Sequence, residues 1–418
     1  MKRFWYTSLV LVTAVAMSSS ADAQSIWNRS SEIGSYRPIL SPASFGSRLG
    51  IRPQDEAPAN PDPAIAPIDE SVVGQEVQPY ADSVMADGSD CNAVSDCDAG
   101  GSSSNVVVGV NGLFFTRDSE DDIVLSQNGA GDILRSTDAN MNTMGGVEFN
   151  LSRRKCNGNG HQFVYWGLYP GEAFAEILGP GNAINAVGLA NVNVLPGPQD
   201  LQTFFNNADS NYTFRSNEFH NIEFNMLRNG GSYTTRHGRN GTFELLGGFR
   251  WFQFNEDWGM GAFSAAGDPT AVEFGIEMEN TLLGLQLGGR SDLELSDKWS
   301  TSITTKLGFF NNRVNQTQGI ATNTGAFAFR TTSGVDDYDY SSSKDDFSML
   351  GELDMALNYR ISNKSRLKFG YRVIGISGVA LALDQIPNDF TLDAEINSIN
   401  SNGNLILGGG YAGLEICF

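Results

Sequence analysis

Apolar and polar residues alternate along most of the chain after residue 104, which is the period of a β-strand. Several alternating stretches are longer than the five or six residues of an ordinary strand. Tilted strands that cross a bilayer need about nine to eleven residues. The pattern therefore predicts ten strands, at 105–117, 144–153, 161–169, 218–228, 241–254, 272–295, 299–312, 347–361, 365–376 and 404–418.

One stretch breaks its own alternation. In 272–295 the apolar residues occupy even positions up to Met278 and odd positions from Leu283 onward. Either a bulge near 279–281 resets the register, or the stretch hides two strands. We expect ten strands, with eight and twelve as the alternatives.

The connections between these stretches alternate between long and short. Their lengths are 26, 7, 48, 12, 17, 3, 34, 3 and 27 residues. Outer-membrane barrels have long external loops and short periplasmic turns. The chain is therefore predicted to be an all-β protein, a transmembrane antiparallel β-barrel of about ten strands over 105–418. With an even number of strands, the N- and C-terminal ends of this segment are both predicted on the periplasmic side.

Two segments precede the predicted barrel. Residues 1–23 have a charged start, an apolar run and a small-residue cleavage site, as in a secretory signal peptide. Residues 24–104 are rich in Pro and Ser and hold 4 Arg against 12 Asp and Glu. Such a composition predicts a disordered acidic periplasmic extension. No later stretch has the roughly 18 consecutive apolar residues of a membrane-spanning helix.

The last predicted strand ends on an aromatic residue. Tyr411, Gly413, Ile416 and Phe418 are similar to the closing-strand signal of outer-membrane barrels, which their barrel-assembly machinery reads. This similarity implies the outer membrane as the location, and the assembly machinery and outer-membrane lipid as partners.

A family resemblance covers roughly 241–418. The stretches 280–288, 306–309, 370–372, 378–382 and 411–415 resemble the β-barrel porins that are abundant in planctomycete-type bacteria. The resemblance implies the barrel fold and a porin function, and it implies no catalytic residues.

The polar positions of the predicted strands give a candidate lumen. Their charges have both signs, so they either pair and fill the interior or line a permeation path. The candidates are Glu148, Glu223, Glu244, Arg250, Glu277, Arg290, Lys306, Glu352, Asp354, Arg360, Lys368 and Arg372. Aromatic residues near strand ends predict interfacial girdles; they are Trp251, Trp299, Phe309, Phe310, Tyr359 and Phe418.

The predicted function is a porin-like passive channel for small solutes. Eight strands are filled by their own side chains, whereas sixteen leave an open channel, so ten predict a narrow path. Residues 105–418 hold 21 Lys and Arg against 35 Asp and Glu, which predicts a preference for cations. The alternatives are a closed structural or surface-display barrel and, less favoured, a soluble secreted glycan-binding β-protein.

No enzyme, cofactor, metal or nucleic-acid function is predicted. His161, His220 and His237 have no second ligand at a suitable spacing, and no hydrolase motif occurs. The acidic runs 118–122 and 336–340 allow a calcium interpretation, but solvated loops are favoured because neither has the spacing of a calcium loop.

The four cysteines predict two disulfides in an oxidising compartment. Cys91 and Cys97 would close a small loop. Cys156 and Cys417 are both predicted at the periplasmic rim, where the first and last strands meet.

Overall fold

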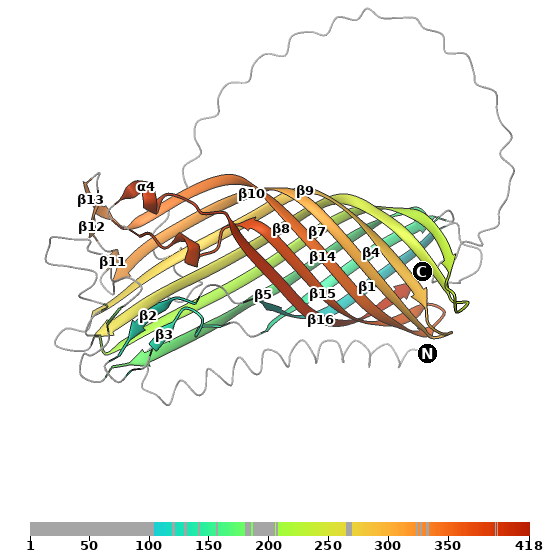
Figure 1. Ribbon diagram of the computed structural model, residues 1–418, viewed down its shortest axis with the longest axis horizontal. Coiled ribbons are helices and arrows are strands. Elements are labelled where there is room, and N and C mark those ends of the chain that lie inside the picture. Colours follow the sequence, from blue (N-terminus) through green and yellow to red (C-terminus); the bar gives the residue numbers. More distant parts are fainter. Residues whose placement is uncertain are drawn as a thin grey trace, which may run out of the picture.

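In the computed structural model of the chain, ten long strands form one closed antiparallel ring (Figure 1). Each strand pairs with its neighbour in sequence among the ten, and β1 closes the ring by pairing with β16. The structure describes residues 104–118, 122–128, 131, 133–140, 143–155, 158–179, 185–186, 205, 208–264, 270–322, 325–326, 328–331, 334–388, 390 and 392–418.

The strands of the ring coincide with the ten predicted ones. They are β1 (Ser104–Arg117), β4 (Met144–Lys155), β5 (Gly160–Leu178), β7 (Ser210–Thr234), β8 (Asn240–Ser264), β9 (Thr270–Glu294), β10 (Trp299–Thr322), β14 (Asp339–Ser362), β15 (Ser365–Val379) and β16 (Gly403–Cys417). The predicted fold class and strand count are confirmed, but several strands extend well past their predicted ends.

Short elements decorate one end of the barrel. They are β2 (Val124–Gln127), β3 (Ile133–Arg135), β6 (Asn185–Ala186), β11 (Gly325–Ala326), β12 (Ala328–Thr331), β13 (Gly334–Asp337), the 3₁₀ turn η2 (Leu383–Gln385) and the one-turn helix α4 (Asp393–Ile396). None of the helices within the described residues is long and apolar enough to cross a membrane.

The two ends of the barrel differ. Tight connections at 156–159, 235–239, 295–298 and 363–364 join strands at one end, which we call the turn end. β1 starts and β16 finishes there, since Val107 pairs with Cys417. We call the opposite end, with its long connections, the loop end. This alternation is the one that the sequence predicted.

The outer wall of the barrel is most apolar toward the turn end. On β9, Leu283, Leu285 and Leu287 point outward and are about 60% exposed or more, as expected of side chains that face lipid. Nearer the loop end the outward positions of the same strand are polar, including Glu277 and Glu279, which border a hollow on the outer wall. We call the outward-facing apolar part of the wall the apolar band.

The predicted bulge or hidden second strand in 272–295 is wrong. β9 is one strand that pairs without a register shift with both β8 and β10. Phe274 and Ile276 are fully buried inside the loop-end half of the barrel, whereas Leu285 lies outside on the turn-end half. The alternation inverts because the apolar environment moves from the outside of the barrel to its inside where the strand leaves the apolar band.

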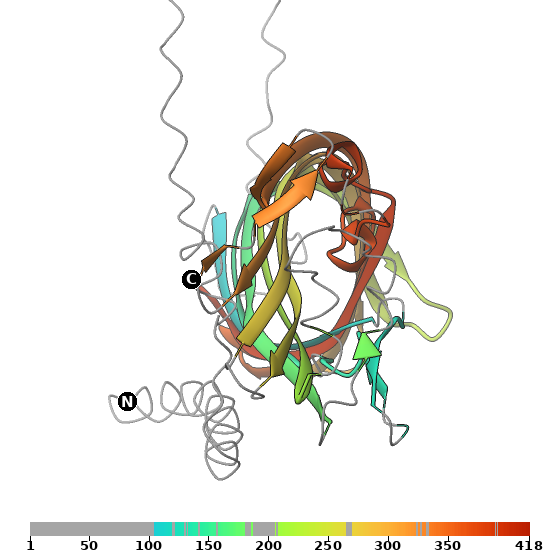
Figure 2. The same cartoon turned by 90° about the vertical axis from the view of Figure 1, so that its left-hand side faces the viewer.

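The connection between β15 and β16 folds into the loop end of the barrel. Leu383, Phe390 and Ile396 are buried there in a core that includes Trp258 and Phe274. The rings of Phe274 and Phe390 meet edge to face at 5.4 Å. Figure 2 shows this connection against the wall of the barrel at the loop end.

Some predictions lie outside the described residues. They are the signal peptide, the acidic extension 24–104 and the three cysteines Cys91, Cys97 and Cys156. Cys417 is disulfide-bonded and lies buried near the turn end. The two cysteine pairings remain predictions.

Candidate functional site: the barrel interior

Inward-facing side chains fill the barrel in successive layers. On β8, Arg250, Phe252 and Glu256 follow one another toward the loop end, and each is fully buried, whereas the outward Phe249 is 64% exposed. On β7, Glu223, Phe219 and Arg215 repeat this order of charged, aromatic and charged side chains. Three layers therefore separate the turn end from the loop-end core.

The first layer is a set of ion pairs, which we call the central network. The ammonium of Lys306 lies 2.9 Å from both Glu223 and Glu352. Arg250 approaches Glu352 at 2.8 Å and donates to Asn221 at 2.6 Å. These side chains come from β7, β8, β10 and β14, so the pairs cross the interior instead of following one wall.

The other half of the central network is built around Arg372 on β15. Its guanidinium lies 2.6 Å from Glu148 and 2.8 Å from Asp354. A 3.7 Å approach to Glu352 joins the two halves. Tyr411 donates its hydroxyl proton to Asp354 at 2.6 Å.

Side-chain amides donate hydrogen bonds to further oxygen atoms of the network. Gln286 donates to Glu223 at 2.8 Å and to the Asn225 carbonyl at 2.7 Å. Asn111 donates to Glu148 at 2.8 Å. Buried carboxylates need such donors because an unmatched charge away from water costs several kcal/mol.

Close backbone approach fixes where β1 and β15 contact β16. A side chain at Gly413 would lie 2.1 Å from the Asn111 amide oxygen, and one at Gly370 would lie 2.2 Å from the Tyr411 ring. Both positions require glycine. Gly413 and Tyr411, two residues of the predicted assembly signal, therefore also form part of the barrel wall around the central network.

All ten strands contribute to the first layer. A side chain that lined a water-wide channel would be accessible, yet these are nearly all buried, and even the side chains of Lys306 and Asp354 are only 9% exposed. The members are Asn111, Glu148, Val164, Asn221, Glu223, Asn225, Arg250, Gln286, Lys306, Glu352, Asp354, Arg372 and Tyr411.

The second layer is apolar, and we call it the aromatic layer. Trp166 meets Phe252 edge to face at 5.8 Å, and Phe219 stacks on Phe254 at 4.7 Å. Every one of the ten strands again supplies at least one buried side chain. They are Leu113, Phe115, Met144, Trp166, Leu168, Phe219, Phe252, Phe254, Leu282, Phe310, Leu350, Ile374, Ile376, Leu405 and Leu407.

The third layer anchors the inserted connection. Glu256 pairs with Arg117 at 2.6 Å and approaches Arg215 at 3.6 Å. Its other oxygen accepts the backbone N–H of Ala382 at 2.9 Å. Asn280 bonds the backbone of Ala380 through both amide atoms, at 2.8 and 2.9 Å. The loop-end connection is thus held by buried polar groups of the wall.

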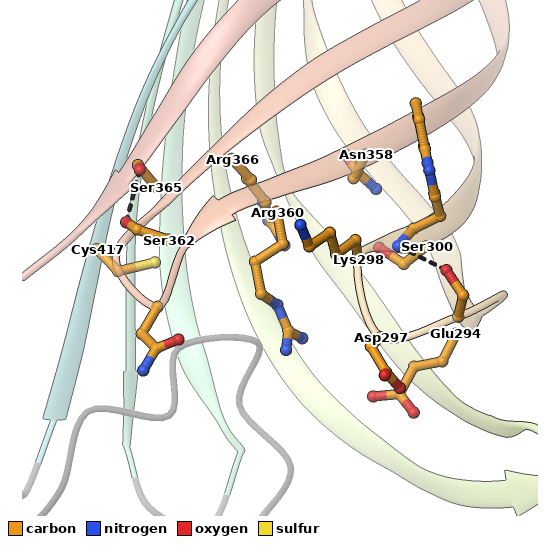
Figure 3. A pocket seen from close by; sticks show the side chains of 13 residues that line it. Glu294, Asp297, Lys298, Ser300, Asn358, Arg360, Ser362, Ser365, Arg366 and Cys417 are labelled. Atoms are coloured by element: carbon orange, nitrogen blue, oxygen red, sulfur yellow. Dashed lines mark hydrogen bonds between the residues drawn. The ribbon is translucent and has the colours of Figure 1, made fainter.

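Little open space remains on the turn-end side of the central network. A cavity of ≈ 40 Å³ lies between the network and Glu244, Arg290 and Lys368, which is room for only a few water molecules. A second small pocket lies between the turns 295–298 and 363–364, and Figure 3 shows Lys298 and Arg360 beside it.

Ten of the twelve predicted lumen residues lie inside the barrel, either in the central network or next to it on the turn-end side. Of the other two, Arg360 is exposed at the turn end. The prediction for Glu277 is wrong, because it lies on the outer wall beyond the apolar band, beside Asp257 of β8. Its neighbours Ile276 and Met278 fill the interior.

The aromatic layer was missed by sequence reasoning. Phe310 was predicted in an interfacial girdle, but it is 2% exposed inside the barrel. The available signal was its even position, which it shares with Lys306 on the inner face of β10. Trp299 and Phe309 do point outward, at 39% and 45% exposed.

The histidines lie on the outside of the barrel. His220 approaches Glu218 at 2.9 Å and Tyr165 at 3.3 Å on the outer wall. His161 stacks on Phe224, and His237 lies in the turn 235–239. Within the described part of the chain, no group of three or more His, Cys, Asp or Glu side chains is arranged to hold a metal ion.

Comparisons with known proteins give one family. Residues 117–403 match the family described as putative beta barrel porin-7. No curated protein matches the chain.

Among solved structures, the Escherichia coli outer membrane protease OmpT is 10% identical, with a TM-score of 0.37 over 78% of this chain and 100% of its own. The toluene transporter TodX of P. putida is 8% identical, with a TM-score of 0.23 over 75% and 89%. An anion-selective porin from Comamonas acidovorans is 8% identical, with a TM-score of 0.19 over 75% and 100%.

Proposed function

Because the chain belongs to the putative beta barrel porin-7 family, we propose that it is an outer-membrane barrel, closed to free diffusion at rest, that acts as a structural or surface-display barrel. The observation that carries this proposal is the pair of complete layers inside the barrel. The first layer, which contains the central network, and the aromatic layer each take side chains from all ten strands, and nearly all of them are buried. A general diffusion porin needs a continuous aqueous path, as in barrels of sixteen or more strands.

The outer membrane is the proposed location, with its lipid and the barrel-assembly machinery as partners. The apolar band supports this, since exposed Leu283, Leu285 and Leu287 would be costly in water. Carbonate extraction of cell envelopes provides the test. Retention in the membrane pellet is expected, and release into the supernatant would favour a soluble β-protein.

A second candidate is a narrow passive channel that prefers small cations. Two observations favour it: ionised groups instead of apolar side chains cross the middle of the barrel, and the family carries a porin name. Opening would require the aromatic layer and the inserted connection to move. No catalytic step is part of either proposal.

Recording ionic current through the refolded protein in a planar bilayer distinguishes the closed barrel from the narrow channel. A closed barrel should give silence or rare, brief openings at moderate voltage. A steady conductance of several nanosiemens, from protein that is heat-modifiable and protease-resistant, would overturn the closed barrel. Frequent small openings would favour the narrow channel.

A further inference from the structure

The β7–β8 hairpin extends beyond β5 at the turn end. β5 stops pairing with β7 at Leu227, whereas β7 and β8 continue to pair as far as Thr234 and Asn240. The turn is closed by hydrogen bonds from the Thr235 N–H to the Arg239 carbonyl and from the Gly238 N–H to the Thr235 carbonyl. Figures 1 and 2 show the hairpin projecting from the barrel.

This extension leaves one side of β7 uncovered. Over 230–234, β8 pairs with β7 on one side, and no described strand pairs with it on the other. The side chains of this stretch are exposed. An uncovered strand edge is a template for another strand, and proteins usually cover it or protect it by charge.

The uncovered edge lies in a cationic region. Residues 228–240 contain Arg228, Arg236 and Arg239 and no Asp or Glu, and all three arginines are exposed. The end of β4 adds Arg153 and Lys155, both exposed. A strand that binds here should therefore carry carboxylates.

The chain itself contains a segment of the complementary charge. Residues 53–104 hold 11 Asp and Glu and no Lys or Arg. They lead into β1, whose first residue Ser104 pairs with Lys155 at the turn end. β1 lies three strands from β7, or about 14 Å at about 4.8 Å per strand. A flexible tether that can span this distance gives the segment a millimolar effective concentration at the uncovered edge of β7.

We propose that the acidic segment 53–104 docks on the uncovered edge of β7 by strand addition. Residues 69–78 (Asp-Glu-Ser-Val-Val-Gly-Gln-Glu-Val-Gln) suit the role, because β-branched residues favour a strand and three carboxylates accompany them. Backbone hydrogen bonds would hold the added strand, and its carboxylates would face the arginines of the hairpin. Docking also shields the edge from other copies of the chain.

A photo-crosslinking residue at Ser232 in the full chain, reconstituted in lipid vesicles, tests the proposal. The expected product is a crosslink to 53–104, with a yield that falls several-fold between low and high salt because exposed charges are screened. A mixture of isotopically labelled and unlabelled chains separates crosslinks within one chain from those between chains. Crosslinks to lipid, crosslinks to another copy, or no crosslink to 53–104 would each overturn the proposal.

Matched variants separate charge from strand addition. R228E/R236E/R239E should reduce the crosslink at least five-fold. The control K298E/R360E/K364E reverses three exposed cations in or beside the other turns of the same end and should leave the yield unchanged. Val73→Pro does not alter the barrel and should also abolish the crosslink, because proline interrupts the ladder. An unchanged yield in the arginine variant or in Val73→Pro would contradict the proposal.

Discussion

At the scale of single residues, the position of a residue along its strand determines whether its side chain lies inside or outside the barrel, because successive side chains point to opposite faces. Strand alternation placed Glu223, Lys306 and Glu352 inside correctly, because inward positions recur every second residue. Alternation alone does not reveal where a strand leaves the apolar band, so Glu277 was assigned to the wrong side. The pairing of particular charges was also inaccessible, since it depends on which strands face each other across the barrel.

Arg372 is expected to be critical for stability. Arg372→Ala would leave Glu148 and Asp354 buried without their guanidinium, which typically costs 3 to 5 kcal/mol. Urea unfolding in lipid vesicles measures the loss. Arg360→Ala, at an exposed arginine of the neighbouring strand, should change the free energy of unfolding by no more than about 0.5 kcal/mol. Equal effects of the two variants would contradict the network argument.

Asp257, on the outer wall beyond the apolar band, should make stability depend on pH. Burial raises its pKa to about 7, and the nearby carboxylates of Glu277, Glu256, Glu218 and Glu172 add to this effect. The native state then holds a proton that the unfolded chain loses near pH 4, so stability is highest below pH 4 and falls as the pH rises to about 7.

Asp257→Asn removes that titration. The variant should be more stable than the parent at pH 8, and the difference should shrink as the pH is lowered toward 4. Unfolding midpoints measured across this range provide the check, and taking the difference between variant and parent cancels the other carboxylates. A difference that is constant with pH would rule out the assignment.

At the scale of elements, the inverted alternation of β9 carries the most information. Its two halves obey the same period, but the apolar residues change from the inner face, as at Phe274, to the outer face, as at Leu285. The sequence contained this signal, and a bulge was the wrong explanation for it. Strand ends toward the loop end were underestimated for a related reason, because many of their outward residues beyond the apolar band are polar.

Two charge substitutions on β9 test this explanation. Leu285→Arg places a charge in the apolar band and should cost about 2 to 4 kcal/mol. Glu277→Arg changes an outward position of the same strand beyond the band and should cost little, since it also relieves repulsion with Asp257. The free energy of unfolding of each variant, measured in lipid vesicles, provides the test. A large loss of stability in Glu277→Arg would place that residue in lipid.

The end of β16 should govern assembly. Phe418 closes the ring through hydrogen bonds with Val106, and its side chain is 67% exposed toward the outside. Deleting Phe418 should reduce insertion into the membrane strongly and leave export intact, because residues 1–23 are unchanged. Heat-modifiable barrel in cell envelopes is the measurement, and normal levels in the deletion would remove the proposed signal.

At the scale of the whole molecule, strand number and side-chain volume together determine the interior. Ten strands were predicted from the alternation of apolar and polar residues, and a narrow or filled interior followed from that number. The aromatic layer shows that the interior is filled. The sequence contained a signal for Phe252, which shares its even position with the predicted lumen residue Arg250, but the predicted strand of Trp166 holds no such charged residue to show which face is inward.

The last prediction concerns what happens when the filling is removed. Replacing Trp166 and Phe252 by Ala deletes two large side chains that meet at 5.8 Å in the aromatic layer. Because close-packed interiors relax only partly around such cavities, the double variant should show small, frequent openings in planar bilayers where the parent is silent. Trp299→Ala, which alters an outward side chain, serves as the control and should stay silent.

Currents through the opened variant should prefer cations. The barrel region has more Asp and Glu than Lys and Arg, so its mean potential is negative and attracts cations. The preference should weaken at high salt, as the Debye length falls below about 10 Å, and weaken further when Glu352 and Asp354 are neutralised. Anion preference would refute the charge argument. Continued silence of the Trp166 and Phe252 double variant would mean that the inserted connection between β15 and β16, and not the aromatic layer, closes the barrel.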